Sequence, residues 1–132
     1  MKEFVLIFGG SLGALAVILG AFGAHALKKK FSEDQLKSFE TGVKYQMYHA
    51  IMLIICGIVF PFRETGQNLT AWFFIIGIVL FSFSIYGLTY NSSINKKIKI
   101  LGPITPIGGL FLIIGWILFT INIAEIALYL KP

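Results

Sequence analysis

Uninterrupted apolar stretches alternate along the chain with short clusters of charge. Four windows contain no Asp, Glu, Lys or Arg, and they cover residues 4–27, 45–62, 65–95 and 100–124. Since about 20 apolar residues cross a hydrocarbon core of about 30 Å as a helix, each window is long enough for one span. The pattern predicts an all-α integral membrane protein, a four-helix bundle with spans at about 4–27, 45–62, 69–90 and 101–123. The connections are short, so the whole chain, 1–132, is expected to form one domain.

The connection before the second span has the features of a helix start. Ser32 is placed as an N-cap, and Gln35 three residues later completes a capping box. Phe31 and Leu36 are spaced as a hydrophobic staple, and Phe39 lies on the same helical face as Leu36. Two interpretations remain open for this segment: a short interfacial helix along the headgroups, or an extension of the second span.

Composition narrows the class of protein. Only 13% of the residues are charged and 57% are hydrophobic, whereas a soluble domain carries charge on about a quarter of its positions. This excludes a soluble enzyme and, despite the net charge of +5, a nucleic-acid-binding domain. A single cysteine excludes a disulfide-stapled module, and Cys56 is expected to be a small core residue.

The lysines predict the orientation of the chain. Eight of the 11 Lys and Arg residues lie in segments 28–44 and 91–99, which four spans place on one side of the membrane. By the positive-inside rule this side is cytoplasmic, so both termini of an inner (plasma) membrane protein are expected outside the cytoplasm. The first window resembles a signal peptide, because Ala24-His25-Ala26 fits a cleavage site. It is interpreted as a true span, because it is too long for a signal core and is followed by three lysines.

Small residues repeat along the first span at alternating spacings of four and three. They are Gly9, Gly13, Ala16, Gly20 and Gly23. Small residues allow close backbone approach, which drives helix association in lipid, so this face is predicted to be a packing surface. We expect it to face another helix of the same chain, and a second copy is the alternative.

Polar side chains gather in the leaflet predicted to be cytoplasmic. His25 ends the first span and His49 begins the second, so the two are expected to flank one pocket, with a structural role at the interface as the alternative. Polar groups converging at one end of a bundle favour a binding site there. The candidate ligand-binding residues are His25, Tyr45, Gln46, Tyr48, His49, Ser84, Tyr86, Gly102, Thr105, Gly108 and Gly109. Trp72 and Trp116 are expected near the outer leaflet, as aromatic-belt residues.

The entry to the fourth span combines prolines, glycines and nearby lysines. A helix N-terminus presents free N–H groups and positive partial charge, which suits an anionic headgroup or phosphate. The alternative is anchoring of the lysines at the lipid surface. The candidate residues for an anionic headgroup are Lys28, Lys29, Lys30, Lys96, Lys97 and Lys99.

Four motifs in chain order give the sequence a family resemblance. They are Gly20-Ala21-Phe22-Gly23-Ala24-His25, Tyr45-Gln46-Met47-Tyr48-His49, Phe81-Ser82-x-Ser84-Ile85-Tyr86 and Gly102-x-Ile104-Thr105-Pro106-Ile107-Gly108-Gly109, the last followed by Gly115-Trp116. The chain resembles the small bacterial membrane proteins grouped as domain of unknown function 423. The resemblance covers nearly the whole chain and implies a four-span inner-membrane protein with eukaryotic relatives and no established activity. Phe83 departs from the family pattern, which usually has Gly between the two serines.

The expected function is that of a binding protein rather than an enzyme. We expect a pocket in the cytoplasmic leaflet that takes a lipid, a small amphiphile or a membrane-protein partner, and no cofactor. The expected partners are membrane lipids, a second copy or another membrane protein. The alternatives are a small transporter or channel subunit, and a redox protein with a metal or haem held by the two histidines.

Overall fold

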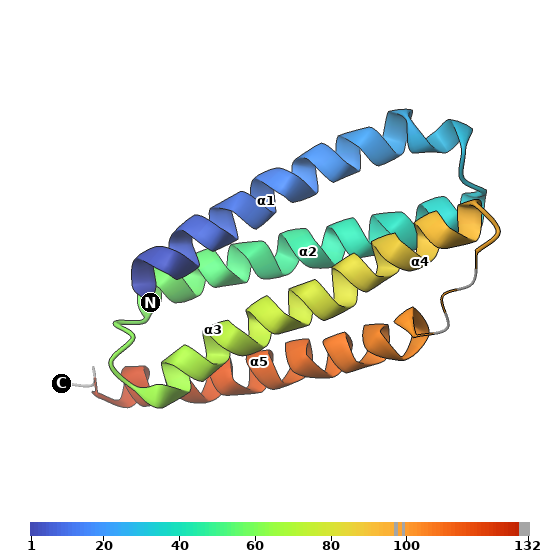
Figure 1. The fold of residues 1–132 in the computed structure, drawn as a ribbon. Helices are drawn as coiled ribbons and strands as arrows, with labels where there is room; N and C mark the ends of the chain where they lie inside the picture. Colours follow the sequence, from blue (N-terminus) through green and yellow to red (C-terminus); the bar gives the residue numbers. More distant parts are fainter. Residues whose placement is uncertain (97, 99, 130–132) are drawn as a thin grey trace.

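The protein is an antiparallel bundle of long helices (Figure 1). The computed structural model describes residues 1–96, 98 and 100–129. Its elements are α1 Lys2–His25, η1 Leu27–Lys29, α2 Glu33–Val59, α3 Thr65–Ile78, the π-helical segment η2 Val79–Phe83, α4 Ser84–Ser93 and α5 Leu101–Tyr129. Since α3, η2 and α4 form one continuous rod, four helices within the described residues are long and apolar enough to span a membrane. The predicted all-α four-helix bundle is confirmed.

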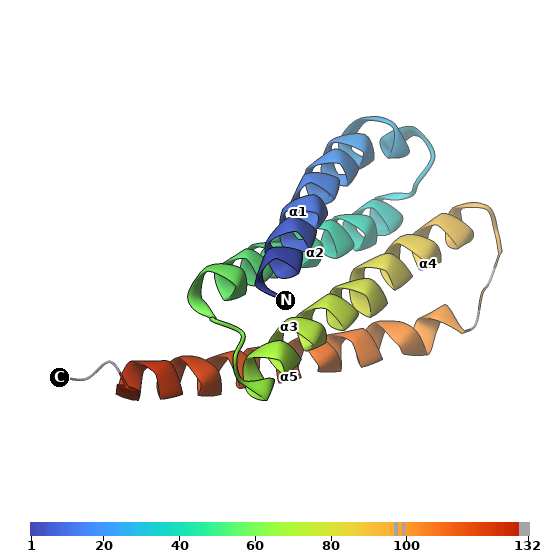
Figure 2. The same cartoon turned by 60° about the vertical axis from the view of Figure 1, so that its left-hand side comes forward.

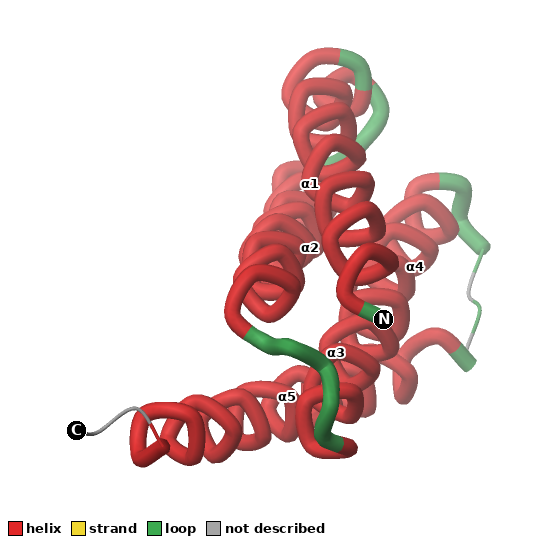
Figure 3. The backbone as a smooth tube through the Cα atoms, turned by 90° about the vertical axis from the view of Figure 1, so that its left-hand side faces the viewer, coloured by secondary structure: helices red, strands yellow, loops and turns green. Residues whose placement is uncertain are grey.

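Two hairpins make up the bundle. In the first, α1 packs along α2, and in the second, α5 packs along α3. The hairpins meet where α2 lies against α3, η2 and α4 (Figures 1 and 3). The start of α1 and the end of α5 lie at the end of the bundle that holds the α2–α3 connection, which we call the terminal end. We call the opposite end, with η1 and the connection from 94 to 100, the lysine end; Lys97 and Lys99 lie outside the described residues.

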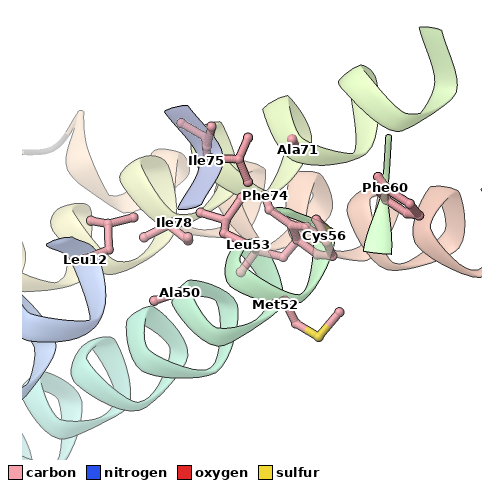
Figure 4. Close-up of a cluster of buried hydrophobic side chains, with 12 residues drawn as sticks. Leu12, Ala50, Met52, Leu53, Cys56, Phe60, Ala71, Phe74, Ile75 and Ile78 are labelled. Carbon is pink, nitrogen blue, oxygen red and sulfur yellow. The ribbon is translucent and has the colours of Figure 1, made fainter. Parts of the chain in front are cut away.

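The apolar core lies between α2 and α3 (Figure 4). Leu53 and Cys56 of α2, Phe60 directly after α2, and Phe74 and Ile78 of α3 are all fully buried there. In lipid such a core is held by close packing, because the surrounding acyl chains are as apolar as the side chains. Cys56 is a core residue, as predicted.

The start of α2 confirms one prediction and decides between two interpretations. Ser32 Oγ accepts a hydrogen bond from the Gln35 N–H, and Gln35 Oε1 accepts one from the Ser32 N–H, so the capping box is present. The helix then runs from Glu33 to Val59 without a break. The interpretation of a separate interfacial helix is therefore wrong, and the segment extends the second span. Lys44, which lies directly before the uncharged window, is one helical turn after Glu40 on this helix. Its Nζ lies 3.9 Å from Glu40 Oε2.

The small residues of α1 lie against α2 of the same chain. A Cβ added at Gly9 would come within 3.1 Å of the Ala50 carbonyl oxygen, and one at Gly23 within 2.9 Å of the Phe39 ring. On α2, Gly57 packs against Leu6 of α1, since a Cβ added at Gly57 would lie 2.6 Å from Leu6 Cγ. The α1–α2 contact thus depends on glycines of both helices.

Candidate functional site

A groove with an amphipathic lining opens at the lysine end of the bundle. It measures about 620 Å³ and lies between α2, α4 and the first turns of α5. A hollow of about 390 Å³ adjoins it, shares Leu88, Ser92 and Gly102 with it and adds Lys96 to the surface. We call the larger cavity the hydroxyl groove; its lining residues are Asp34, Gln35, Ser38, Thr41, Ile85, Leu88, Thr89, Ser92, Gly102 and Thr105.

The hydroxyl groove exists because α4 and α5 diverge toward the lysine end (Figure 2). Two side-chain bonds span the gap at its edges. The hydroxyls of Ser84 and Thr105 lie 2.7 Å apart and join α4 to α5, and Gln35 Nε2 donates to Ser92 Oγ at 3.0 Å, joining α2 to α4. These bonds hold the three helices around a cavity that packing does not close.

Two hydroxyl groups that line this groove are already used as donors within their own helices. Thr41 donates to the Lys37 carbonyl at 2.9 Å, and Thr89 donates to the Ile85 carbonyl at 2.7 Å. Each hydroxyl has one hydrogen and two lone pairs, so toward the groove these threonines can only accept. With the Asp34 carboxylate, they supply hydrogen-bond acceptors to the lining, and Ser92, which accepts from Gln35, keeps its own hydroxyl hydrogen for donation.

Gln46 and Tyr86 do not line the hydroxyl groove. Gln46 is fully buried; its Nε2 donates to the Leu12 carbonyl of α1 at 2.8 Å, and its Oε1 accepts from the Tyr86 hydroxyl of α4 at 2.8 Å. Gly42 makes room for the Tyr86 ring, since an added Cβ would lie 2.7 Å from Cε1. We call Gln46 and Tyr86 the buried joint, because their hydrogen bonds connect α1, α2 and α4. These bonds occupy the side-chain amide of Gln46 and the hydroxyl of Tyr86.

His49 lies in a second cavity, which we call the aromatic groove. This cavity measures about 490 Å³ and opens between α2 and α5. His49 is only 5% exposed; its Nδ1 lies 2.7 Å from the Tyr45 carbonyl, and Trp116 Nε1 donates to its Nε2 at 3.1 Å. This network puts the proton on Nδ1 and uses both ring nitrogens. The lining residues are Tyr45, Tyr48, His49, Phe81, Gly109, Leu112, Ile113 and Trp116.

The expectation that His25 and His49 flank one pocket is wrong. His25 is exposed at the end of α1, where its Nδ1 lies 3.0 Å from the Ala21 carbonyl of its own helix. His49 lies in the middle of α2, about 24 Å along the axis from Glu33, because this helix begins well before the uncharged window. The geometry therefore does not fit a metal or haem held by both imidazoles. Within the described ranges, no group of three or more His, Cys, Asp or Glu side chains could hold a metal ion.

The remaining predicted residues divide between the two grooves and a packing contact. Gly102 and Thr105 line the hydroxyl groove, with Ser84 bonded to Thr105, and Gly109 lines the aromatic groove. Gly108 lies against the backbone of η2, where its missing side chain allows close approach rather than ligand binding. Lys28, Lys29 and Lys30 are exposed at the lysine end.

The sequence analysis missed several lining residues. Asp34, Gln35, Ser38 and Thr41 belong to the segment whose location was left open, and their spacing along one side of a helix is the signal that they share a surface. The partnership of Trp116 with His49 gave no local signal, because it joins residues 67 positions apart. Trp116 had been expected in the aromatic belt.

The four long apolar helices define a multi-pass integral membrane protein. Comparison with known sequences shows that the chain belongs to the family described as protein of unknown function (DUF423), whose model matches residues 19–109. The resemblance seen in the motifs is thereby confirmed.

Relatives from two bacterial genera match nearly the whole chain, and all three described below are named UPF0382 membrane proteins. The relative of Staphylococcus aureus strain bovine RF122 is 43% identical over 122 residues, which are 92% of this chain and 94% of the relative. The relative YwdK of Bacillus subtilis strain 168 is 42% identical over 124 residues, or 92% of this chain and 95% of YwdK. A relative of Staphylococcus epidermidis strain ATCC 12228 is 39% identical over 128 residues, or 96% and 99%. No solved structure matches the chain.

Proposed function

We propose that the protein binds a membrane phospholipid in the hydroxyl groove. The observation that carries this proposal is the divergence of α4 from α5, which leaves about 620 Å³ open at the boundary between the charged end and the apolar spans. The lining is amphipathic: Ile85 and Leu88 suit an acyl chain, and the polar residues of α2 and α4 suit a headgroup. A cavity of this size is in the range that takes a small molecule.

The same proposal includes an orientation for the chain. The lysine end faces the cytoplasm of an inner (plasma) membrane, and both termini face outward, because Lys and Arg concentrate on the cytoplasmic side of membrane proteins. The hydroxyl groove then opens in the cytoplasmic leaflet.

Reporter fusions test the orientation. Alkaline phosphatase fused after Pro132 is expected to be active, because it folds only outside the cytoplasm, and green fluorescent protein at the same position is expected to be dark. A fusion in the connection from 94 to 100 should give the opposite pair of signals. A bright fluorescent fusion at the C-terminus would overturn the orientation and move the groove to the outer leaflet.

Filling the groove tests the binding. Nothing lies within 4 Å of a Cβ added at Gly102, so the side chain of Gly102→Leu starts in open space at the lining of the groove and can occupy part of it. We expect about tenfold less phospholipid retained by this variant, as measured by native mass spectrometry of protein extracted in mild detergent. Gly10→Leu is the matched control, since Gly10 also has open space around it and lies on α1, away from the groove. Equal retention by the natural chain and both variants would refute binding in this groove.

A further inference from the structure

A proline of α5 frees a backbone carbonyl in the hydroxyl groove. In an α-helix the carbonyl of Gly102 would accept from the N–H of residue 106, but that residue is Pro106 and has no N–H. Gly102 lines both the hydroxyl groove and the adjoining hollow. None of the side-chain hydrogen bonds between described residues ends on this carbonyl. A residue that lines the groove therefore has a backbone acceptor whose α-helical donor is missing.

Three other polar groups of the groove are also acceptors. The Thr41 and Thr89 hydroxyls donate within their own helices and offer lone pairs, and the Asp34 carboxylate is an acceptor alone. A headgroup that only accepts hydrogen bonds, such as a bare phosphate, would leave these groups unpaired. A headgroup that donates would give them hydrogen-bond partners.

The lysines around the groove favour a headgroup that is anionic as well as a hydrogen-bond donor. Lys96 lies in the adjoining hollow, and Lys28, Lys29 and Lys30 are exposed at the same end of the bundle. Clustered lysines next to a membrane span attract anionic lipids. The headgroup that fits must therefore carry a negative phosphodiester near Lys96 and hydrogen-bond donors near Gly102.

We propose that the hydroxyl groove selects phosphatidylglycerol, through donation from the free hydroxyls of its headgroup to the Gly102 carbonyl and its neighbouring acceptors. This inference rests on the proposed function, because it names the lipid that occupies the same groove. The phosphodiester lies toward Lys96, and the glycerol hydroxyls lie toward Gly102 and Asp34. Pro106 is thus a specificity-determining residue, which acts by keeping a carbonyl available.

The test compares lipids that differ in one property at a time. The full chain in detergent is titrated with phosphatidylglycerol, with phosphatidylmethanol, which keeps the phosphodiester but has no headgroup hydroxyl, and with zwitterionic phosphatidylcholine. Binding is read by native mass spectrometry. We expect phosphatidylglycerol to bind about fivefold more tightly than phosphatidylmethanol, which is the effect of about one hydrogen bond. Phosphatidylcholine should bind least.

The variant Pro106→Ala tests the selection of phosphatidylglycerol separately from phospholipid binding as such. The alanine N–H can bond the Gly102 carbonyl, so the preference for phosphatidylglycerol over phosphatidylmethanol is expected to fall from about fivefold to about twofold, while binding of phosphatidylmethanol is unchanged. Unfolding cannot mimic this result, because it would weaken both lipids equally. Equal binding of the two anionic lipids by the natural chain, or an unaltered preference in Pro106→Ala, overturns the inference but leaves lipid binding intact. Absence of binding for all three lipids would refute the proposed function itself.

Discussion

Gly108→Ala is expected to lower the free energy of unfolding by about 3 kcal/mol, or to prevent folding. At Gly108, helix α5 reaches the backbone of the π-helical segment η2. An added Cβ would lie 2.7 Å from the Leu80 carbonyl carbon and 2.8 Å from Phe81 Cα, and it would also meet the Phe81 backbone nitrogen. A flexible side chain could turn away from the new methyl group, but two backbones in hydrogen-bonded helices cannot. The two helices would have to separate.

Two other glycines, one next to Gly108 and one on α1, provide the controls for this prediction. An added Cβ at Gly109 would make an ordinary contact of 3.7 Å with the Phe81 ring, and one at Gly10 would meet nothing within 4 Å. Because alanine is favoured over glycine in a helix by about 1 kcal/mol, both substitutions are expected to leave stability unchanged or to raise it. Denaturation with sodium dodecyl sulfate in mixed micelles, followed by circular dichroism, measures all three variants. A Gly108→Ala variant as stable as Gly109→Ala would show that the helices do not approach as described.

The sequence analysis predicted the helices well and their registers poorly. The uncharged windows located the spans because spanning helices must be long and apolar, and the capping box marked the start of α2 because it is a local arrangement. The extent of α2 was underestimated because Glu40 and Lys44 interrupt its uncharged stretch, although both lie on the exposed surface of the helix. Charge on an exposed helix face ends a window without ending a helix. His49 was consequently placed at a helix end instead of mid-helix.

The candidate site could be predicted only in part, because the sequence does not give the register between helices. Sequence periodicity gives the face of a helix on which a residue lies, but it does not give the height at which two helices meet. Gly102 and Thr105, which the sequence analysis grouped with Ser84, line one groove, and Ser84 is bonded to Thr105 at its edge. Which of the other polar residues belong to the buried joint and which to the aromatic groove depends on the height at which α2 packs against α4 and α5. The proline that frees the Gly102 carbonyl was seen in the sequence, but its consequence required knowing that Gly102 faces a cavity.

Gln46→Leu is expected to cost about 2 kcal/mol of folding free energy. The substitution nearly preserves side-chain volume at a fully buried position but removes the two hydrogen bonds that join α2 to Leu12 of α1 and to Tyr86 of α4. It also leaves the Tyr86 hydroxyl without its partner. Hydrogen bonds between membrane helices are worth about 0.6 kcal/mol on average and up to about 1.7 kcal/mol, so loss of two bonds with an unpaired group gives the larger figure.

A double-mutant cycle isolates the bond between Gln46 and Tyr86. Tyr86→Phe removes the hydroxyl that donates to Gln46, so each single substitution breaks the same hydrogen bond. The double variant Gln46→Leu/Tyr86→Phe is therefore expected to be about 1 kcal/mol more stable than the sum of the two single effects predicts. Additive effects would show that the two side chains are not bonded. Gln46 lines neither groove, so the Gln46→Leu variant should retain as much phospholipid as the natural chain wherever both are folded. Lipid loss in a folded Gln46→Leu variant would mean that the buried joint and the hydroxyl groove are coupled, since α4 forms part of both.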